Sequence, residues 1–169
     1  MDEGCFSECD SLKSFALTEL EENKILNEIK LPDKCLFKAE SLEEIELTAN
    51  EINLGSSCFC GSKKLQKIVL HSKKISNKDI CFSECESLKT FIVPKLENDL
   101  ITESLCLEDQ CFLNSKNLEE IEISANEINF YKKCGLKKLY SCFGNRLEFF
   151  GNKIVTVLFF WKLNIFFWK

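Results

Sequence analysis

Proline, glycine and histidine are scarce in this chain of 169 residues, which has two, six and one of them respectively. So few prolines and glycines exclude a low-complexity or linker-rich chain. The single histidine is His71, in "VLHSKK", and a Cys–His nucleophile would need it close to a thiolate. Nothing in the sequence orients it toward one, so we expect His71 to be an exposed turn residue.

The signatures of common enzymes are missing as well. The sequence has no phosphate-binding glycine loop, Gly-x-Ser-x-Gly elbow, HExxH motif or dinucleotide fingerprint. Paired carboxylates occur in "LEEIEL", but they repeat along the chain and have no acid or base partner in a different environment. We therefore expect a protein that is not an enzyme and needs no cofactor.

Positive charge is not concentrated anywhere in the chain, whose net charge is -5. This balance argues against nucleic acid as the main partner, because such binders gather Lys and Arg on one face. The first residues, "MDEGCFSECD", are acidic and polar, whereas a secretory signal begins basic and continues apolar. We expect a cytoplasmic protein, with the cell surface as the alternative if an upstream signal exists.

What the chain does have is a folded composition and many cysteines. Hydrophobic residues make up 45% and charged residues 29%, which is too apolar for disorder and fits one domain. The eleven cysteines are an odd number without an export signal, so reduced thiols are the better expectation than a disulfide framework.

The cysteines reveal a repeat. "CFSECDSLKSF" at 5–15 returns as "CFSECESLKTF" at 81–91, and "LEEIELTANEINL" at 42–54 returns as "LEEIEISANEINF" at 118–130. Both pairs are 76 residues apart. Repeating units of 23 or 30 residues begin at marker cysteines, namely Cys5, Cys35, Cys58, Cys81, Cys111 and Cys134. Architecture built of stacked units explains such a pattern better than a reactive site used twice.

Two apolar ladders recur within the units. Seven residues after the marker, a leucine opens an alternating segment typical of a short strand, at Leu12, Leu42, Leu65, Leu88 and Leu118. The second ladder lies six residues before the next marker, at Ile29, Ile52, Ile75, Leu105 and Ile128. One unit cannot bury its apolar face alone, so we expect the units to stack as coils of a solenoid in register.

The pattern C-F-x-x-C-x-S-L-x-x-φ-x-φ, where φ is apolar, resembles the BspA-like, Treponema-type leucine-rich repeats. The resemblance implies a leucine-rich-repeat solenoid with a short parallel β-sheet on the concave face and loops, short helices or second strands on the convex side. It also implies a non-enzymatic recognition role with a protein partner, and it permits a surface adhesin or membrane-associated array. We assign residues 1–146 to the array. The sixth unit, "CGLKKLYSCFGN", is two residues short before its Leu139, which leaves the C-terminal end of the array open.

Cysteine pairs are the main candidates for chemistry. Cys5 with Cys9 and Cys81 with Cys85 form C-x-x-x-C, and Cys58 with Cys60 forms C-x-C. The two C-x-x-x-C pairs lie three coils apart and cannot share a zinc ion, which needs four converging ligands. We interpret the thiols as small buried hydrophobes stacked along the coils, with thiol-based metal binding or redox function as the alternative.

The candidate binding residues face outward from the expected strands. Val69 and Ile92 would be adjacent apolar residues with charged surroundings, which is the anatomy of a protein contact. The predicted protein-binding residues are Glu46, Val69, Ile92, Glu120 and Glu122. The alternative is a solvated face with two incidental aliphatics, partly neutralised by Lys13 with Glu43, Glu44 with Lys67, and Lys89 with Glu119.

The repeat ends near Leu147, and residues 147–169 form an aromatic tail, "LEFFGNKIVTVLFFWKLNIFFWK". Its apolar run is too short and too interrupted for a spanning helix. It could be a cap, a membrane-interface anchor, or a non-native end. We favour the last, expect local disorder or poor packing there, and allow membrane contact only through this tail.

Overall fold

The computed structural model describes residues 2–18, 25–96, 100–131, 148–150 and 153–157. These residues contain ten strands and no helix. The strands are β1 (Ser14–Leu17), β2 (Leu26–Leu31), β3 (Glu44–Leu54), β4 (Lys67–Asn77), β5 (Thr90–Val93), β6 (Thr102–Leu107), β7 (Glu120–Ile123), β8 (Ala125–Tyr131), β9 (Glu148–Phe150) and β10 (Lys153–Val157).

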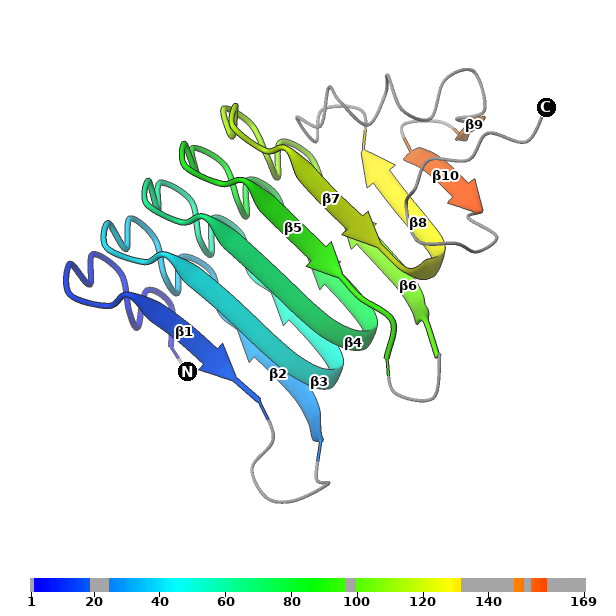
Figure 1. Ribbon diagram of the computed structural model, residues 1–169, viewed down its shortest axis with the longest axis horizontal. Coiled ribbons are helices and arrows are strands. Elements are labelled where there is room, and N and C mark those ends of the chain that lie inside the picture. The colour runs from blue at the N-terminus through cyan, green and yellow to red at the C-terminus, as the bar shows by residue number, and fades with distance from the viewer. Residues whose placement is uncertain (1, 19–24, 97–99, 132–147, 151–152, 158–169) are drawn as a thin grey trace.

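The chain winds into stacked coils, and each coil adds strand to two layers (Figure 1). The first layer consists of β1, the first halves of β3 and β4, β5 and β7, all paired in parallel. The second layer consists of β2, the second halves of β3 and β4, β6 and β8, also parallel. The two long strands β3 and β4 therefore run through the corner from one layer into the other.

The register between coils confirms the repeat lengths. In the first layer Phe15, Ile45, Ile68, Phe91 and Ile121 are successive partners. In the second layer the partners are Ile29, Ile52, Ile75, Leu105 and Ile128. All five members of the second ladder are buried. The predicted leucine-rich-repeat solenoid is therefore present, and its second layer consists of second strands rather than short helices.

One detail of the prediction was wrong. The marker leucines do not open the strands, because each strand begins two residues later, as at Leu42 before Glu44 and Leu65 before Lys67. The leucines lie in the turn that enters the strand, and Leu42, Leu65 and Leu88 are each fully buried. The residues that follow them are in register, because Gln66 N donates to Glu43 O at 2.8 Å and Lys89 N donates to Gln66 O at 2.9 Å, so the register of the coils extends beyond the strands.

The third side of each coil is a run of turns joined by backbone hydrogen bonds. Phe6 N donates to Cys35 O at 2.8 Å and Phe59 N donates to Cys81 O at 2.9 Å. Around the five described markers, the residue just before and the residue three after the cysteine have positive φ, at Gly4, Glu8, Lys34, Lys38, Ser57, Gly61, Ile80, Glu84, Gln110 and Asn114. This left-handed geometry turns N–H groups toward the next coil, as in Lys34 N to Ser56 O at 2.9 Å.

Gly55 meets the neighbouring coil where the two backbones come closest. A Cβ added at Gly55 would clash with the backbone of Pro32 and Asp33. Gly55 N also donates to Leu31 O at 2.9 Å, which holds the two coils together at this point. A glycine is needed here because of space rather than because of an unusual φ angle.

Ile80 offers a test of the left-handed turns, because a β-branched residue at φ 63° is strained. Replacing Ile80 by Asn, which tolerates this conformation, is expected to raise the free energy of unfolding by about 1 kcal/mol. Ile101→Asn is the control, since Ile101 is also half-buried but has no positive φ. Urea denaturation followed by circular dichroism measures both; a lower midpoint for Ile80→Asn would contradict the argument.

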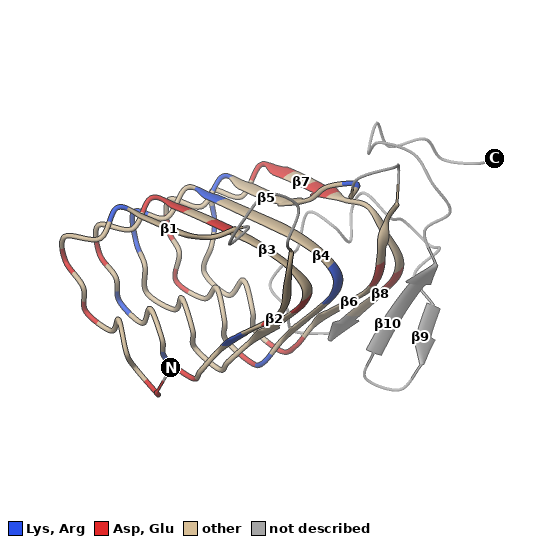
Figure 2. Ribbon diagram, turned by 90° about the horizontal axis from the view of Figure 1, so that it is seen from below, with Lys and Arg blue, Asp and Glu red and all other residues tan. Residues whose placement is uncertain are grey.

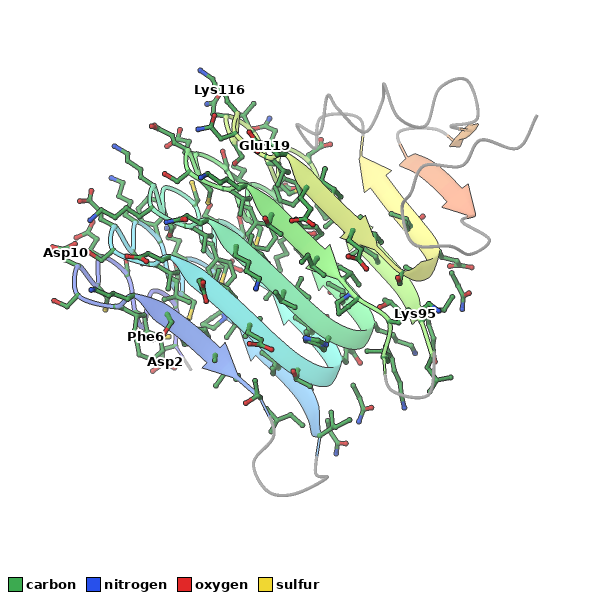
Figure 3. All side chains as sticks on the ribbon, in the orientation of Figure 1. Asp2, Phe6, Asp10, Lys95, Lys116 and Glu119 are labelled. Atoms are coloured by element: carbon green, nitrogen blue, oxygen red, sulfur yellow. The ribbon has the colours of Figure 1, made fainter. Side chains whose placement is uncertain are left out.

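The N-terminal coil is more open than the coils inside the array. Leu12, Phe15 and Leu17 are half-buried, whereas Ile45 and Leu47, the register partners of Phe15 and Leu17, are buried. In Figure 3 the labelled Phe6 lies at this same end, and its side chain is 36% exposed. Each of β1 and β2 pairs with β3 only among the described residues, so this coil is held from one side.

At the other end, β10 pairs antiparallel with β8 and with β9. Within residues 147–169 only β9 and β10 are described. The predicted boundary at 146/147 and the predicted disorder of the tail therefore stay predictions. The sixth marker, Cys134, also lies outside the described residues.

Candidate protein-binding surface

Four of the predicted binding residues share one row across the first layer. Glu46 is the register partner of Val69, Val69 of Ile92, and Ile92 of Glu122. Glu120 lies in the neighbouring row, as the partner of Thr90. The structure thus brings all five predicted residues onto the outer face of one sheet.

Exposure follows the strand alternation. Ile68 and Phe91 point into the core and are fully buried, whereas Val69 and Ile92 beside them are half-exposed. Glu46 and Glu120 are exposed and Glu122 is half-buried. Two aliphatic side chains therefore lie side by side at the surface, with a carboxylate at each end of their row.

Acidic residues gather on β7, which Figure 2 shows in red and which carries Glu120 and Glu122. The expected ion pairs Glu44 with Lys67, Lys13 with Glu43 and Lys89 with Glu119 lie on neighbouring coils, but none is within ion-pair distance among the described residues. The face is therefore less self-neutralised than the sequence suggested. The carboxylates of Glu46 and Glu120 remain exposed to a partner.

Two polar neighbours of the row were not predicted. His71 Nε2 lies 3.6 Å from Glu46 Oε1, and Thr90 Oγ1 donates to Glu120 Oε2 at 3.2 Å. The expectation that His71 is an exposed turn residue was wrong, because β4 continues past it and the imidazole is half-buried. The alternation Ile68, Leu70, Ser72 through "IVLHS" was the available sign that the strand continues.

The thiols form a second set of chemically active groups. The five described marker cysteines stack along the turn side, and those at 35, 58, 81 and 111 are fully buried. Cys5 is the exposed end of the column, with its Sγ 3.3 Å from Cys35 Sγ. Among the described residues, Cys5, Cys9, Cys35, Cys58, Cys60, Cys81 and Cys85 form no disulfide.

The environment of these thiols opposes ionisation. Burial raises the pKa of the Cys58, Cys81 and Cys85 thiols. For Cys35 the hydrogen bond with the Cys58 thiol is the largest cause of its raised pKa, and burial adds to it. Because the thiolate is the reactive form and the usual metal ligand, the inner thiols are poor nucleophiles.

Within the described ranges, no group of three or more His, Cys, Asp or Glu side chains could hold a metal ion. The same part of the chain has no helix that is both long and apolar enough to cross a membrane.

A family model for the BspA type leucine rich repeat region matches residues 1–134 with six copies. This chain belongs to the BspA-type leucine-rich-repeat family. The match covers every described coil, and the coils of this BspA-type array have the register that the repeat lengths require. No curated protein and no solved structure matches the chain.

Proposed function

We propose that this BspA-type array is a non-enzymatic protein-interaction module. Its binding surface is the outer face of the first layer, which the family resemblance assigns to the concave side. The observation that carries the proposal is the row in which Val69 and Ile92 are direct neighbours between Glu46 and Glu122. Aliphatic groups surrounded by charge are the usual centre and rim of a protein contact.

The charges of the row indicate the chemistry of the partner. Glu46, Glu120 and Glu122 surround the aliphatic pair, and only His71 and the Thr90 hydroxyl contact these carboxylates among the described residues. A partner that places an apolar side chain on Val69 and Ile92 and a Lys or Arg near the carboxylates would complement this surface. Such charges chiefly accelerate association and select the partner.

A pull-down with the intact chain and with Val69→Glu plus Ile92→Glu tests the proposal. We expect the double variant to bind the partner at least about tenfold more weakly, since replacing hot-spot residues costs more than about 1.4 kcal/mol of binding free energy. The matched control is Ser76→Glu plus Ser104→Glu, which adds the same charge to half-buried positions on β4 and β6 of the second layer.

Loss of the partner from the first variant alone, with retention by the control and a weaker interaction at high salt, supports this surface. Equal recovery of every partner by all three proteins would remove Val69 and Ile92 from the epitope. Loss from both variants would place the contact elsewhere or indicate unfolding, which circular dichroism distinguishes.

A surface adhesin or membrane-associated array remains the alternative, because the family resemblance permits it. Sequencing the 5′ end of the transcript decides whether an export signal precedes Met1. Flotation with vesicles, comparing the intact chain with one ending at residue 146, tests the tail for membrane contact. The proposed cytoplasmic location requires that both results be negative.

A further inference from the structure

The turn side of the first two coils places two thiols against each other. Cys5 Sγ and Cys35 Sγ are 3.3 Å apart, and Phe6 N donates to Cys35 O at 2.8 Å beside them. Gly4 N also donates to Asp33 O at 3.1 Å, so backbone bonds on both sides of Cys5 hold the coils in register. A disulfide needs the sulfurs at about 2.05 Å, so the two Sγ atoms must move closer than their 3.3 Å contact for the bond to form.

Solvent reaches this pair from one side only. Cys5 is exposed, whereas Cys35 is fully buried beneath it and the next thiols, Cys58 and Cys81, are equally buried. A reagent dissolved in water therefore meets Cys5 first. Cys9, in the same coil, has Ala39 at the equivalent position of the next coil and no thiol to pair with there.

We propose that Cys5 and Cys35 form a reversible oxidation site. A low-molecular-weight disulfide oxidises the two thiols, and the resulting intrachain disulfide links the first coil to the second. The Cys5 thiolate attacks one sulfur of the reagent RSSR and releases RS⁻, which leaves a mixed disulfide on Cys5. The Cys35 thiolate then attacks Cys5 Sγ and releases the second RS⁻. Two protein thiols are oxidised, RSSR is reduced to two RSH, and both protein protons are taken up by the leaving thiolates.

We expect both thiols to react slowly at neutral pH. Burial and the contact with Cys35 raise the pKa of Cys5, and the Cys58 thiol and burial raise that of Cys35. Because only the thiolate attacks, the rate is expected to increase about tenfold for each pH unit below these pKa values. The second step also needs Cys35 to become accessible, which the half-exposed first coil allows when it opens locally.

The link would stabilise the N-terminal coil, whose core residues are only half-buried. Among the described residues, its strands β1 and β2 pair only with β3. Its ion pair, Lys34 Nζ to Glu3 Oε1 at 3.3 Å, is exposed. A covalent bond between residues 5 and 35 closes a ring that includes β1 and β2 and restricts the opened state. This inference is independent of the proposed binding function.

The test treats the reduced full-length protein with oxidised glutathione at several pH values and follows the intact mass and the linked peptides. We expect the intact mass to decrease by two hydrogen atoms and digestion to release a peptide linked through Cys5 and Cys35. Dithiothreitol should reverse both changes. Cys35→Ser and Cys35→Ala should stop at a glutathione adduct on Cys5, Cys5→Ser should give neither product, and the control Cys9→Ser should behave as the unchanged chain.

Hydrogen exchange provides the structural readout. Exchange of the β1 amides, residues 14–17, should slow at least about tenfold on oxidation and recover on reduction, with no change in Cys5→Ser. A stable glutathione adduct on the unchanged chain, a Cys5 disulfide between two copies, or equal oxidation of the buried Cys58 and Cys81 would each overturn the proposal.

Discussion

Replacing Phe82 by alanine is expected to lower the free energy of unfolding by about 3–5 kcal/mol. Phe82 is fully buried and lies at the centre of an aromatic cluster. Its ring centroid is 5.4 Å from that of Phe59 and 5.3 Å from that of Phe112, both stacked, and 6.0 Å from Phe91. The substitution leaves a cavity between three consecutive coils, and rigid backbone bonds along the turns prevent the coils from closing it.

Phe6→Ala is the matched control, because Phe6 follows its marker cysteine just as Phe82 does. Its side chain is 36% exposed and contacts one ring, that of Phe15, at 5.8 Å. We expect it to cost less than half as much as Phe82→Ala, because Phe6 is only partly buried and packs against one ring rather than three. Urea denaturation by circular dichroism measures both. Equal losses would mean that the aromatic cluster is not the centre of the core.

The large effect expected for Phe82→Ala depends on the stacking of matching residues in successive coils, which the repeat spacing of the sequence predicts. The number of residues between matching positions in the sequence is enough to place Phe59, Phe82 and Phe112 one above another, because coils in register repeat side-chain positions. The same spacing predicts that Val69 lies beside Ile92, and the register of β4 with β5 confirms it. Periodic features are predictable because each coil repeats the environment of its neighbour.

Features without a residue signature were not predictable. Eight of the residues with positive φ are not glycine, and they include Lys34, Ile80 and Gln110. Bonds from one coil to the next impose this geometry, so the residue types themselves do not indicate it. The ends of the strands were missed for the same reason: β4 continues past His71 because β3 beside it continues, whereas the residues alone suggest a turn.

Asn77 interrupts an otherwise apolar column, and replacing it by leucine is expected to stabilise the fold. Leu31, Leu54, Asn77 and Leu107 are successive register partners in the second layer. Asn77 is only 3% exposed, and its Oδ1 has no hydrogen-bond partner among the described residues. Its Nδ2 donates to Lys78 O at 2.9 Å, so one half of the amide is satisfied.

The expected gain for Asn77→Leu is about 2–3 kcal/mol. Removing an unsatisfied buried polar group contributes about 1–3 kcal/mol, burying a leucine contributes about 1.5–3 kcal/mol, and losing the bond to Lys78 O costs about 1 kcal/mol. Fitting the larger side chain reduces the gain further. Leu54 and Leu107 on either side show that the column accommodates leucine at this coil spacing.

Asn53→Leu is the control, because it makes the same substitution one residue before Leu54, on the outer face of the second layer. The Asn53 amide donates to Glu28 Oε1 and Glu51 Oε1, both at 3.0 Å, and its side chain is only half-buried. That variant should be neutral or destabilised. Urea midpoints of the two variants and the unchanged chain decide the matter: if Asn77→Leu unfolds at lower urea, the column does not have the packing described, and the amide must be satisfied in a way that this geometry does not show.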